Sequence, residues 1–302
     1  MKHFLSINQL SVEEIKKIIQ VAINEKYAMK IGRPQFSESL SGKVLAMIFE
    51  KPSTRTRISF DLAMRQLGGT TMVLNANDMQ IGHGESISDT AKVMSRFVDA
   101  IMLRCHGEDK LLELAQNSSI PVANALTNES HPCQILAAAM TFQEHGKILE
   151  KLKITWVGDF NNVTNSYIEL AEKLGFAFVI SSPEITIKQK EQVSEAQKFN
   201  KKIVFEKDPK IAVQNTDIIV TDTWVSMGDG SKDLTKFLPY QVNTELASYA
   251  KENYLFSHCL PAHRGEEITN EIIDGKNSIV FDEAENRLHI QKAILLYMFD
   301  II

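Results

Sequence analysis

The stretch KVLAMIFEKPSTRTRISFDLAMRQLGGTTMVLNA, residues 43–76, contains the pattern on which the predicted fold depends. Two apolar runs, 43–50 and 70–76, are typical of strands. Between them, apolar residues recur at i, i+3, i+4 and i+7 from Phe60, and this helical pattern ends at Gly68 and its neighbouring glycine. A strand, a helix and a second strand in this order predict a parallel pair of strands joined by a crossover helix.

The same alternation continues in both directions along the chain. A first helix is expected at 11–30, where Ser11 and Glu14 form a capping box, and polar segments separate the later apolar runs. Strands that are apolar on both sides and separated by helices favour parallel sheets covered on both faces. Further strands are predicted at 99–104, 121–126, 153–159, 176–182, 201–207, 217–222 and 254–260, and further helices at 86–97, 131–146, 165–175, 185–200, 209–216 and 285–300.

The chain of 302 residues is long enough for roughly two domains of about 150 residues each. We therefore predict an α/β fold with two doubly wound parallel-sheet domains, with a substrate cleft between them and helices that bridge the domains. The first domain is expected to contain residues 1–146 together with the C-terminal helix 285–302, and the second residues 147–284.

Composition excludes several classes of function. Hydrophobic residues make up 44% and charged residues 24%, which are ordinary values for a globular protein. The net charge is −5 and no run of five basic residues occurs, which argues against a nucleic-acid partner. The longest apolar run, 293–299, is far shorter than the roughly 18 residues of a membrane span. With no leader pattern and three scattered cysteines, we expect a cytoplasmic protein with free thiols.

The turn after the first strand of this stretch has the composition of an anion site. Ser53 to Arg57 place three hydroxyl groups and two arginines in the first turn of a helix, where free N–H groups and the helix dipole attract negative charge. The alternative is a capped helix with solvated arginines. No GxxxxGK or GxGxxG pattern occurs, so a nucleotide cofactor is not expected.

Other polar residues follow the ends of other predicted strands, where a doubly wound fold binds its ligands. His131 and Gln134 begin a helix three residues apart, so both can donate to one carbonyl oxygen. In the second half, an acid, amides and a hydroxyl suit an amino-acid ligand. Together with the anion site they favour group transfer from a small acyl phosphate. The residues are Arg104, His131, Gln134, Asn161, Asn162, Asp222, Ser226 and Met227.

The segment HCLPAHRGEE, residues 258–267, allows three interpretations. His258, Cys259 and His263 are potential zinc ligands, but a structural zinc site needs four ligands and the second pair is absent. Cys259 could instead be a nucleophile or a buried structural thiol. Its place at the end of a predicted strand favours a position in the cleft.

Four motifs closely resemble those of the ornithine carbamoyltransferase family in their order and separation: FEKPSTRTR, HPCQ, DxxxSMG from Asp222 to Gly228, and HCLPAHRGEE. The resemblance covers the chain nearly from end to end. The first and second are typical of the transcarbamoylase superfamily, while SMG and HCLP mark its ornithine branch. The resemblance implies transfer of the carbamoyl group of carbamoyl phosphate to the δ-amine of L-ornithine, giving L-citrulline and phosphate. It also implies no cofactor or metal, and a homotrimer or larger assembly that shares its active sites between subunits.

The resemblance also assigns roles to residues. It implies that Arg104, His131, Cys259 and Asp222 are catalytic, and that Gln80 acts across a subunit boundary. The choice of Asn162 over Asn161 rests on the motif alignment. The implied carbamoyl phosphate site is Ser53, Thr54, Arg55, Thr56, Gln80, Arg104, His131, Gln134, Cys259, Leu260 and Arg287, and the implied ornithine site is Asn162, Asp222, Ser226 and Met227.

Other functions remain open at this point. The aspartate-specific relatives share STRTR and HPxQ but carry a lysine in the loop near residues 80–85, where this chain has His83, and they lack SMG. Relatives that act on acetylornithine or putrescine differ mainly in the second domain. A non-catalytic paralogue that binds an anion, and a metal-dependent hydrolase, are the alternatives from other classes.

Overall fold

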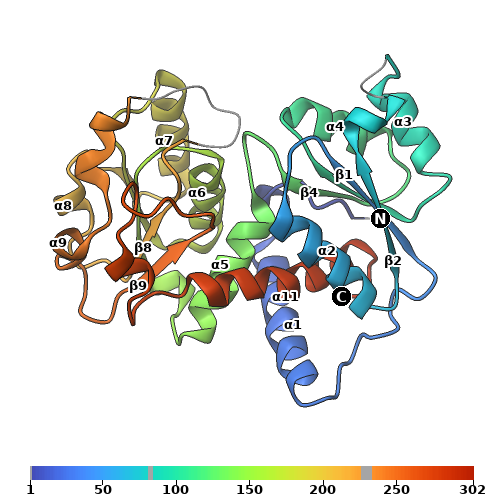
Figure 1. The fold of residues 1–302 in the computed structure, drawn as a ribbon, viewed down its shortest axis with the longest axis horizontal. Coiled ribbons are helices and arrows are strands. Elements are labelled where there is room, and N and C mark those ends of the chain that lie inside the picture. The colour runs from blue at the N-terminus through green and yellow to red at the C-terminus, as the bar shows by residue number, and fades with distance from the viewer. Residues whose placement is uncertain (1, 81–83, 226–232) are drawn as a thin grey trace. The chain divides into compact units, whose positions relative to one another are not determined.

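The computed structural model describes residues 2–80, 84–225 and 233–302. The chain divides into two compact units, which are described separately (Figure 1): unit 1 contains Met1–Met140 and Glu285–Ile302, and unit 2 contains Thr141–Ala284. Each unit is built on one parallel sheet with helices around it. The predicted class, an α/β fold with two parallel-sheet domains, is confirmed.

The sheet of unit 1 has the strand order β2-β1-β3-β4, and all its strands are parallel. The chain passes from β1 to β2 on one side and then returns to place β3 on the other side. This reversal leaves a crevice at the carboxyl ends of β1 and β3, which is where doubly wound folds bind ligands. The strands are β1 (Val44–Phe49), β2 (Thr70–Asn75), β3 (Ala100–Arg104) and β4 (Val122–Leu126), and the helices are α1 (Val12–Lys30), α2 (Thr54–Gln66), α3 (Ile87–Met94), α4 (Glu108–Asn117), most of α5 (Pro132–Glu144) and most of α11 (Val280–Met298).

Side chains of β1 alternate between two cores. Ala46 and Ile48 lie in a buried cluster with Leu111 and Leu114 of α4, and Figure 1 shows α3 and α4 together on one side of this sheet. Successive side chains of a strand point to opposite faces, so Leu45 and the other odd-numbered residues of β1 face the second core. Both sets are buried, which explains the unbroken apolar run in the sequence.

Strand β2 differs from the prediction that both faces of each strand are covered. It lies at the edge of its sheet, and Met72 and Val73 are 49% and 41% exposed. An edge strand has a neighbour on one side only, so an apolar run there does not by itself imply burial.

The sheet of unit 2 has the parallel order β7-β6-β5-β8-β9. Its order reverses between β5 and β8, so the second crevice lies at the carboxyl ends of those two strands. The strands are β5 (Lys153–Val157), β6 (Ala177–Ser181), β7 (Ile203–Phe205), β8 (Ile218–Thr221) and β9 (Leu255–His258), and the helices are α6 (Asn162–Leu174), α7 (Ile187–Phe199), α8 (Pro209–Ala212), α9 (Thr244–Ala247) and α10 (Asn270–Ile273).

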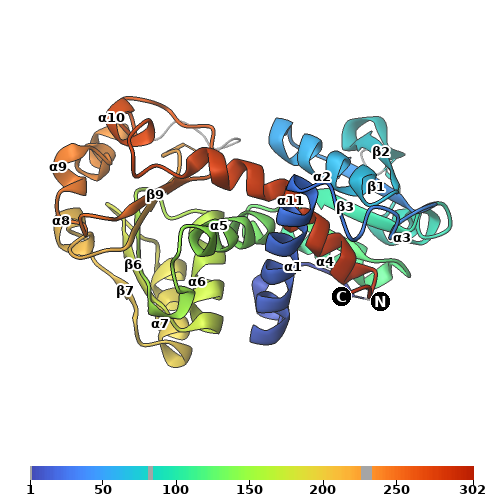
Figure 2. The same cartoon turned by 90° about the horizontal axis from the view of Figure 1, so that it is seen from below.

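The two faces of this sheet have different cores. Tyr167 of α6 lies 5.6 Å from the ring of Phe178 and 6.2 Å from that of Trp156. A separate cluster contains Phe256 of β9 and Leu246 of α9. Figure 2 agrees with this division, since α6 and α7 lie on one side of β6 and α8 and α9 on the other.

Helix α11 begins at Val280, earlier than the predicted start at residue 285, because residues 280–284 contain no glycine or proline that would prevent helix formation. Its apolar residues Ile290, Ile294, Leu295 and Met298 are fully buried, as the sequence predicted. Among the described residues, α11 included, no helix combines the length and apolar character that crossing a membrane requires.

Within unit 1, α11 is joined to α1 by a buried ion pair. Lys292 Nζ lies 3.5 Å from Glu25 Oε1, and the two side chains are 1% and 3% exposed. Glu25 Oε2 also accepts a hydrogen bond from the Gln35 N–H at 3.0 Å. Burial lowers the pKa of Lys292, and the Glu25 carboxylate opposes this shift.

Replacing both charges of this ion pair should change the free energy of unfolding little, whereas removing only one of them should lower it strongly. Lys292→Met leaves a buried carboxylate without its cation, and the free energy of unfolding should fall by about 3–5 kcal/mol. The double variant Glu25→Gln/Lys292→Met removes both charges and should recover most of that loss. Urea denaturation of the three proteins measures this. A double variant as unstable as Lys292→Met would contradict the interpretation.

Candidate active site

The predicted anion site forms at the start of α2. Strand β1 ends at Phe49, and Ser53 caps the helix by accepting the Thr56 N–H at 3.3 Å. The free N–H groups of this first turn therefore lie beyond the carboxyl end of the central strand, in the crevice between β1 and β3. This is the position that the sequence predicted for an anion.

Only one of the two arginines in this turn is oriented toward that site. Arg57 is exposed, lies 5.1 Å over the ring of Phe49, and donates to Asn75 Oδ1 at 3.3 Å. Arg57, which the sequence analysis did not assign to the site, is therefore the arginine of this turn that lies away from it. Each helix residue is rotated about 100° from the one before it, so Arg55 and Arg57, two positions apart, leave the helix in nearly opposite directions.

Thr56 and Arg287 meet although they lie 231 positions apart in the chain. Arg287 of α11 donates from Nη2 to Thr56 Oγ1 at 2.7 Å, and the two residues are 3% and 0% exposed. The buried guanidinium group is thus fixed beside the start of α2. No local pattern of the sequence reveals this contact, and only the family resemblance pointed to Arg287.

Arg104 lies at the end of β3, where it pairs in register with Phe49 of β1. The pairing of β3 with β4 shifts between Leu103 and Arg104, and such an irregularity changes the direction in which a side chain points. Arg104 is 6% exposed. It therefore extends the positive charge of the α2 turn to the next strand.

His131 lies directly before α5 and is buried. Burial lowers its pKa well below the usual 6.5, and the positive charges of Arg287, Arg104 and Arg55 lower it further. The imidazole is therefore neutral near pH 7 and can donate one hydrogen bond from its protonated nitrogen. Gln134, 2% exposed, follows one turn later, with its N–H bonded to the His131 carbonyl at 3.1 Å.

Unit 1 thus brings three guanidinium groups and a neutral imidazole to one helix start. This combination favours a dianion such as a phosphate group, with a neutral donor left for an adjoining carbonyl oxygen. Perturbed pKa values of this kind are concentrated at functional sites. Gln80 is not joined to the group by any contact among the described residues of this one chain, because it is exposed on the loop after β2.

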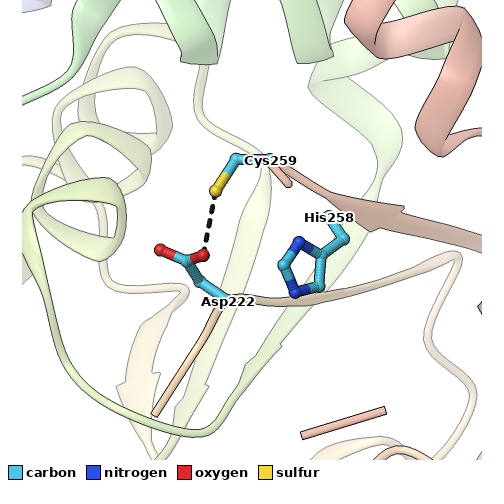
Figure 3. A group of neighbouring side chains, drawn as sticks. All are labelled: Asp222, His258 and Cys259. Atoms are coloured by element: carbon cyan, nitrogen blue, oxygen red, sulfur yellow. Dashed lines mark hydrogen bonds between the residues drawn. The ribbon is translucent and has the colours of Figure 1, made fainter. Parts of the chain in front are cut away.

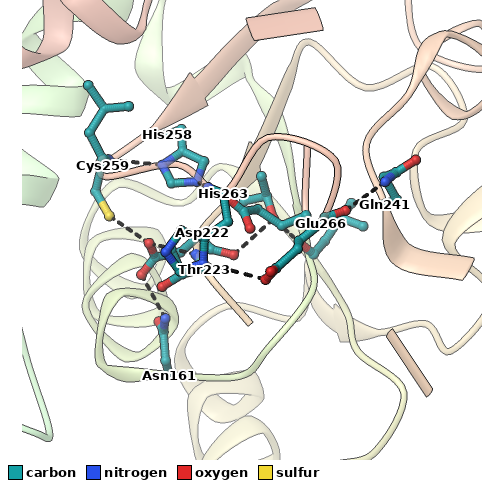
Figure 4. Close-up of polar contacts among 12 residues, drawn as sticks. Asn161, Asp222, Thr223, Gln241, His258, Cys259, His263 and Glu266 are labelled. Atoms are coloured by element: carbon teal, nitrogen blue, oxygen red, sulfur yellow. Dashed lines mark hydrogen bonds and ion pairs between the residues drawn. The ribbon is translucent and has the colours of Figure 1, made fainter. Parts of the chain in front are cut away.

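Unit 2 has a complementary group at the crevice between β5 and β8 (Figure 3). Asp222 follows β8 and is 9% exposed, and Cys259 follows β9 and donates from Sγ to Asp222 Oδ1 at 3.0 Å. The Thr223 N–H binds the same oxygen at 2.8 Å, and the Asn161 amide donates to Oδ2 at 2.8 Å. Figure 4 shows these donors around the carboxylate. Asp222 is therefore held in one orientation before any ligand binds.

The two neighbouring asparagines have different positions. Asn161 is the N-cap of α6: its Oδ1 accepts the N–H groups of Val163 and Thr164 at 2.9 and 3.3 Å, while its amide holds Asp222. Both polar atoms of the Asn161 side chain are therefore engaged in hydrogen bonds within the protein. This supports Asn162, the first residue of the helix, as the one to propose for ligand binding.

The HCLP segment is anchored through His258, whose side chain is fully buried. Its Nδ1 accepts the Leu260 N–H at 2.9 Å and its Nε2 lies 3.2 Å from Glu267 Oε1. Ligand atoms of Asp222, His258 and Cys259 lie within 4.8 Å of one another, and so do those of His263, Glu266 and Glu267. Because both ring nitrogens of His258 are engaged, a metal in the first group would have to displace one of these hydrogen bonds.

Leu260 has a left-handed backbone, with φ of 56°. This conformation is costly for a residue with a branched side chain and persists where the surroundings impose it, often at functional sites. Here the Leu260 N–H is held by the hydrogen bond to His258 Nδ1. Ser226 and Met227, the other residues predicted for the ornithine side, lie outside the described residues, as does His83.

Two family profiles match the chain. One, described as the carbamoyl-P binding domain of aspartate/ornithine carbamoyltransferase, matches residues 2–144, and the other, its Asp/Orn binding domain, matches residues 150–298. The fold and the paired sites therefore define an enzyme of carbamoyl transfer. The chain belongs to the aspartate/ornithine carbamoyltransferase family, which confirms the resemblance seen in its motifs.

Relatives within this family include ornithine carbamoyltransferases. The one from Bradyrhizobium diazoefficiens is 50% identical over 303 residues, covering 100% of this chain and 98% of the relative. The solved structure of ornithine carbamoyltransferase from Pyrococcus furiosus is similar with a TM-score of 0.92 and 44% identity, covering 98% of this chain and 96% of that chain. The solved structure of the enzyme from Burkholderia thailandensis is similar with a TM-score of 0.89 and 39% identity, covering 99% of this chain and 98% of that chain.

The lowered pKa of His131 predicts a pH effect on stability. Below about pH 6.5 the unfolded chain binds a proton at this imidazole that the folded chain does not, so the free energy of unfolding should fall as the pH decreases. For one group the slope approaches ~1.4 kcal/mol per pH unit. Between pH 7 and pH 5, the free energy of unfolding of His131→Asn should therefore decrease by about 2 kcal/mol less than that of the wild type. Urea denaturation at the two pH values measures this difference. Equal losses would contradict the buried, neutral imidazole.

Proposed function

We propose that this enzyme transfers the carbamoyl group of carbamoyl phosphate to the δ-amine of L-ornithine and releases L-citrulline and phosphate. The observation that carries the proposal is the group of Arg55, Arg104 and Arg287 around the neutral His131 at the start of α2. The relatives named as ornithine carbamoyltransferases support ornithine as the acceptor.

In this proposal the first turn of α2 binds the phosphate. Free N–H groups, the hydroxyl groups of Ser53, Thr54 and Thr56, and the guanidinium groups of Arg55 and Arg287 offer donors to its oxygens. Arg104, His131 and Gln134 would donate to the carbonyl oxygen, which gains charge during attack. Each preorganised donor of this kind typically contributes about 3–4 kcal/mol to the transition state.

The acceptor amine is assigned to the group around Asp222. A carboxylate has about four lone-pair positions. Among the described residues, donors from Asn161, Thr223 and Cys259 occupy three of them, and we assign the fourth to the amine of ornithine. Asn162, Ser226 and Met227 are proposed to hold the α-carboxylate and α-amine, while Cys259 and the backbone of Leu260 lie next to both substrates.

The chemistry follows from these positions. The neutral δ-amine attacks the carbonyl carbon, the new C–N bond forms, and the C–O bond to phosphate breaks. The leaving phosphate carries away the electron pair and can accept the amine proton, so no cofactor is needed. Holding the amine next to the carbon is the main task of unit 2 in this scheme.

We further propose that residues 1–146 with 285–302 act as the carbamoyl phosphate domain and residues 147–284 as the ornithine domain. The ranges of the family profiles support a boundary between residues 144 and 150. The assignment of the C-terminal helix to the first domain is supported by the compact units, which group Glu285–Ile302 with Met1–Met140. The cytoplasmic location stays a prediction from the sequence.

A homotrimer that shares its active sites completes the proposal. Ile58 and Leu62 of α2 and Met72 and Val73 of the edge strand β2 are 39–54% exposed in the single chain. Exposed apolar side chains on neighbouring elements are typical of a subunit interface, although Met72 and Val73 point to opposite faces of their strand. Gln80 follows this strand and is proposed to complete the carbamoyl phosphate site of a neighbouring subunit.

The function is tested with a panel of amines. With carbamoyl phosphate, the purified protein should produce citrulline from ornithine and no carbamoylated product from aspartate, putrescine or acetylornithine. Arg55→Ala should lower kcat/KM for carbamoyl phosphate at least a hundredfold, because its guanidinium contributes to phosphate binding and to the transition state. Product with another amine alone would refute ornithine as the substrate, and no product with any would favour the non-catalytic paralogue.

The assembly is tested by sedimentation. The wild type should sediment at about three times 34.0 kDa or a multiple of it. Ile58→Arg places a charge in the proposed interface and should yield smaller species with reduced activity. Phe199→Arg changes a side chain that is 77% exposed on α7 and should leave the assembly intact. A monomeric wild type, or an intact Ile58→Arg assembly, would refute this interface.

A further inference from the structure

Glu50 connects two segments that carry substrate-binding residues. It follows β1 and precedes the turn with Arg55, and its backbone N–H donates to the carbonyl oxygen of Arg104 at 2.8 Å. Its carboxylate accepts the His106 N–H at 2.9 Å through Oε2 and Lys110 Nζ at 2.8 Å through Oε1. Glu50 therefore holds this segment at two points: its backbone binds the Arg104 carbonyl, and its side chain binds the His106 N–H.

The next residue extends this connection to the third strand end. Lys51, 8% exposed, donates from Nζ to Asn128 Oδ1, and the Asn128 N–H donates to the His106 carbonyl at 3.0 Å. Three hydrogen bonds connect Glu50 to His106, His106 to Asn128 and Asn128 to Lys51, and the peptide bond between Glu50 and Lys51 closes the ring. The ring joins the loops after β1, β3 and β4. Three residues assigned to carbamoyl phosphate lie in or directly beside these loops: Ser53, Arg104 and His131.

We propose that Glu50 is a positioning residue for carbamoyl transfer, acting through Arg104. The inference rests on the proposed function. The carboxylate side chain is 13% exposed and spans from the end of β1 to the turn after β3. Without it, residues 104–106 lose the side-chain part of their attachment to β1. Arg104 then moves relative to the α2 turn, and a displacement of about 1 Å can cost up to about a hundredfold in rate.

The chain contains a matched control at the opposite end of the same two strands. Asp99 precedes β3, and its N–H donates to the Val44 carbonyl at 2.9 Å. Its carboxylate accepts the Val44 N–H and Lys43 Nζ, both at 2.9 Å. Asp99 therefore links β1 to β3 with the same chemistry as Glu50, but at the amino ends of the strands, away from the site.

Three variants distinguish the effect of the length of the Glu50 side chain from the effect of its charge. Glu50→Gln keeps the length of the side chain and an acceptor for the His106 N–H, so kcat should stay within about threefold of wild type. Glu50→Asp keeps the charge but is one methylene shorter, and kcat should fall about tenfold or more. Asp99→Ala should alter kcat less than about twofold, whatever its effect on thermal stability. A Glu50→Asp enzyme with the kinetics of Asp99→Ala would overturn the proposal.

Equilibrium binding tests the same idea without an amine. Arg104 is assigned to the carbonyl end of the ligand, so Glu50→Asp should weaken carbamoyl phosphate binding at least fivefold in calorimetry and inorganic phosphate less than twofold. Equal weakening of both ligands would refute positioning through Arg104. Because this measurement needs no turnover, it decides the role of Glu50 even if the wild type fails to carbamoylate ornithine, a result that would count against the proposed function alone.

Discussion

The reversal of strand order within each parallel sheet is the constraint on which the rest of the structure depends. It occurs between β1 and β3 in unit 1 and between β5 and β8 in unit 2. On either side of a reversal, the crossover helices turn away from each other and leave the carboxyl ends of the two strands uncovered. Arg104 and the α2 turn lie at the first opening, and Asp222 and Asn161 lie at the second.

The two openings have opposite chemistry. Unit 1 presents positive charge and donors, and the pKa of His131 is lowered first by burial of the imidazole and then by the positive charges of the guanidinium groups beside it. Unit 2 presents a carboxylate that protein donors already orient. A dianionic acyl donor and an amine are the ligands that these environments separately favour. Because Asp222 of unit 2 and Arg287 of unit 1 are already held by protein hydrogen bonds, these two side chains need little further ordering when a substrate binds.

Much of this arrangement could be predicted from the sequence, because apolar strand runs and helix caps are local signals. All nine predicted strands are found, with ends that differ by one or two residues. An error arises where neighbours in space decide the outcome: Met72 and Val73 of the edge strand β2 are exposed, although their apolar run resembles those of the buried strands. Contacts such as Thr56 with Arg287 join segments that are distant in the chain, so no local pattern contains them.

The cysteines of the chain differ in a way that has a practical consequence. Cys105 and Cys133 are fully buried, and burial raises the pKa of each thiol to about 12, so neither forms a thiolate readily. Cys259 is partly exposed and lies against Asp222. A thiol-specific label added to the folded protein would therefore attach at a single place, beside the carboxylate of unit 2. Because Cys259 is also proposed to lie next to both substrates, its protection from labelling would report ligand occupancy, with no cysteine to be added or removed.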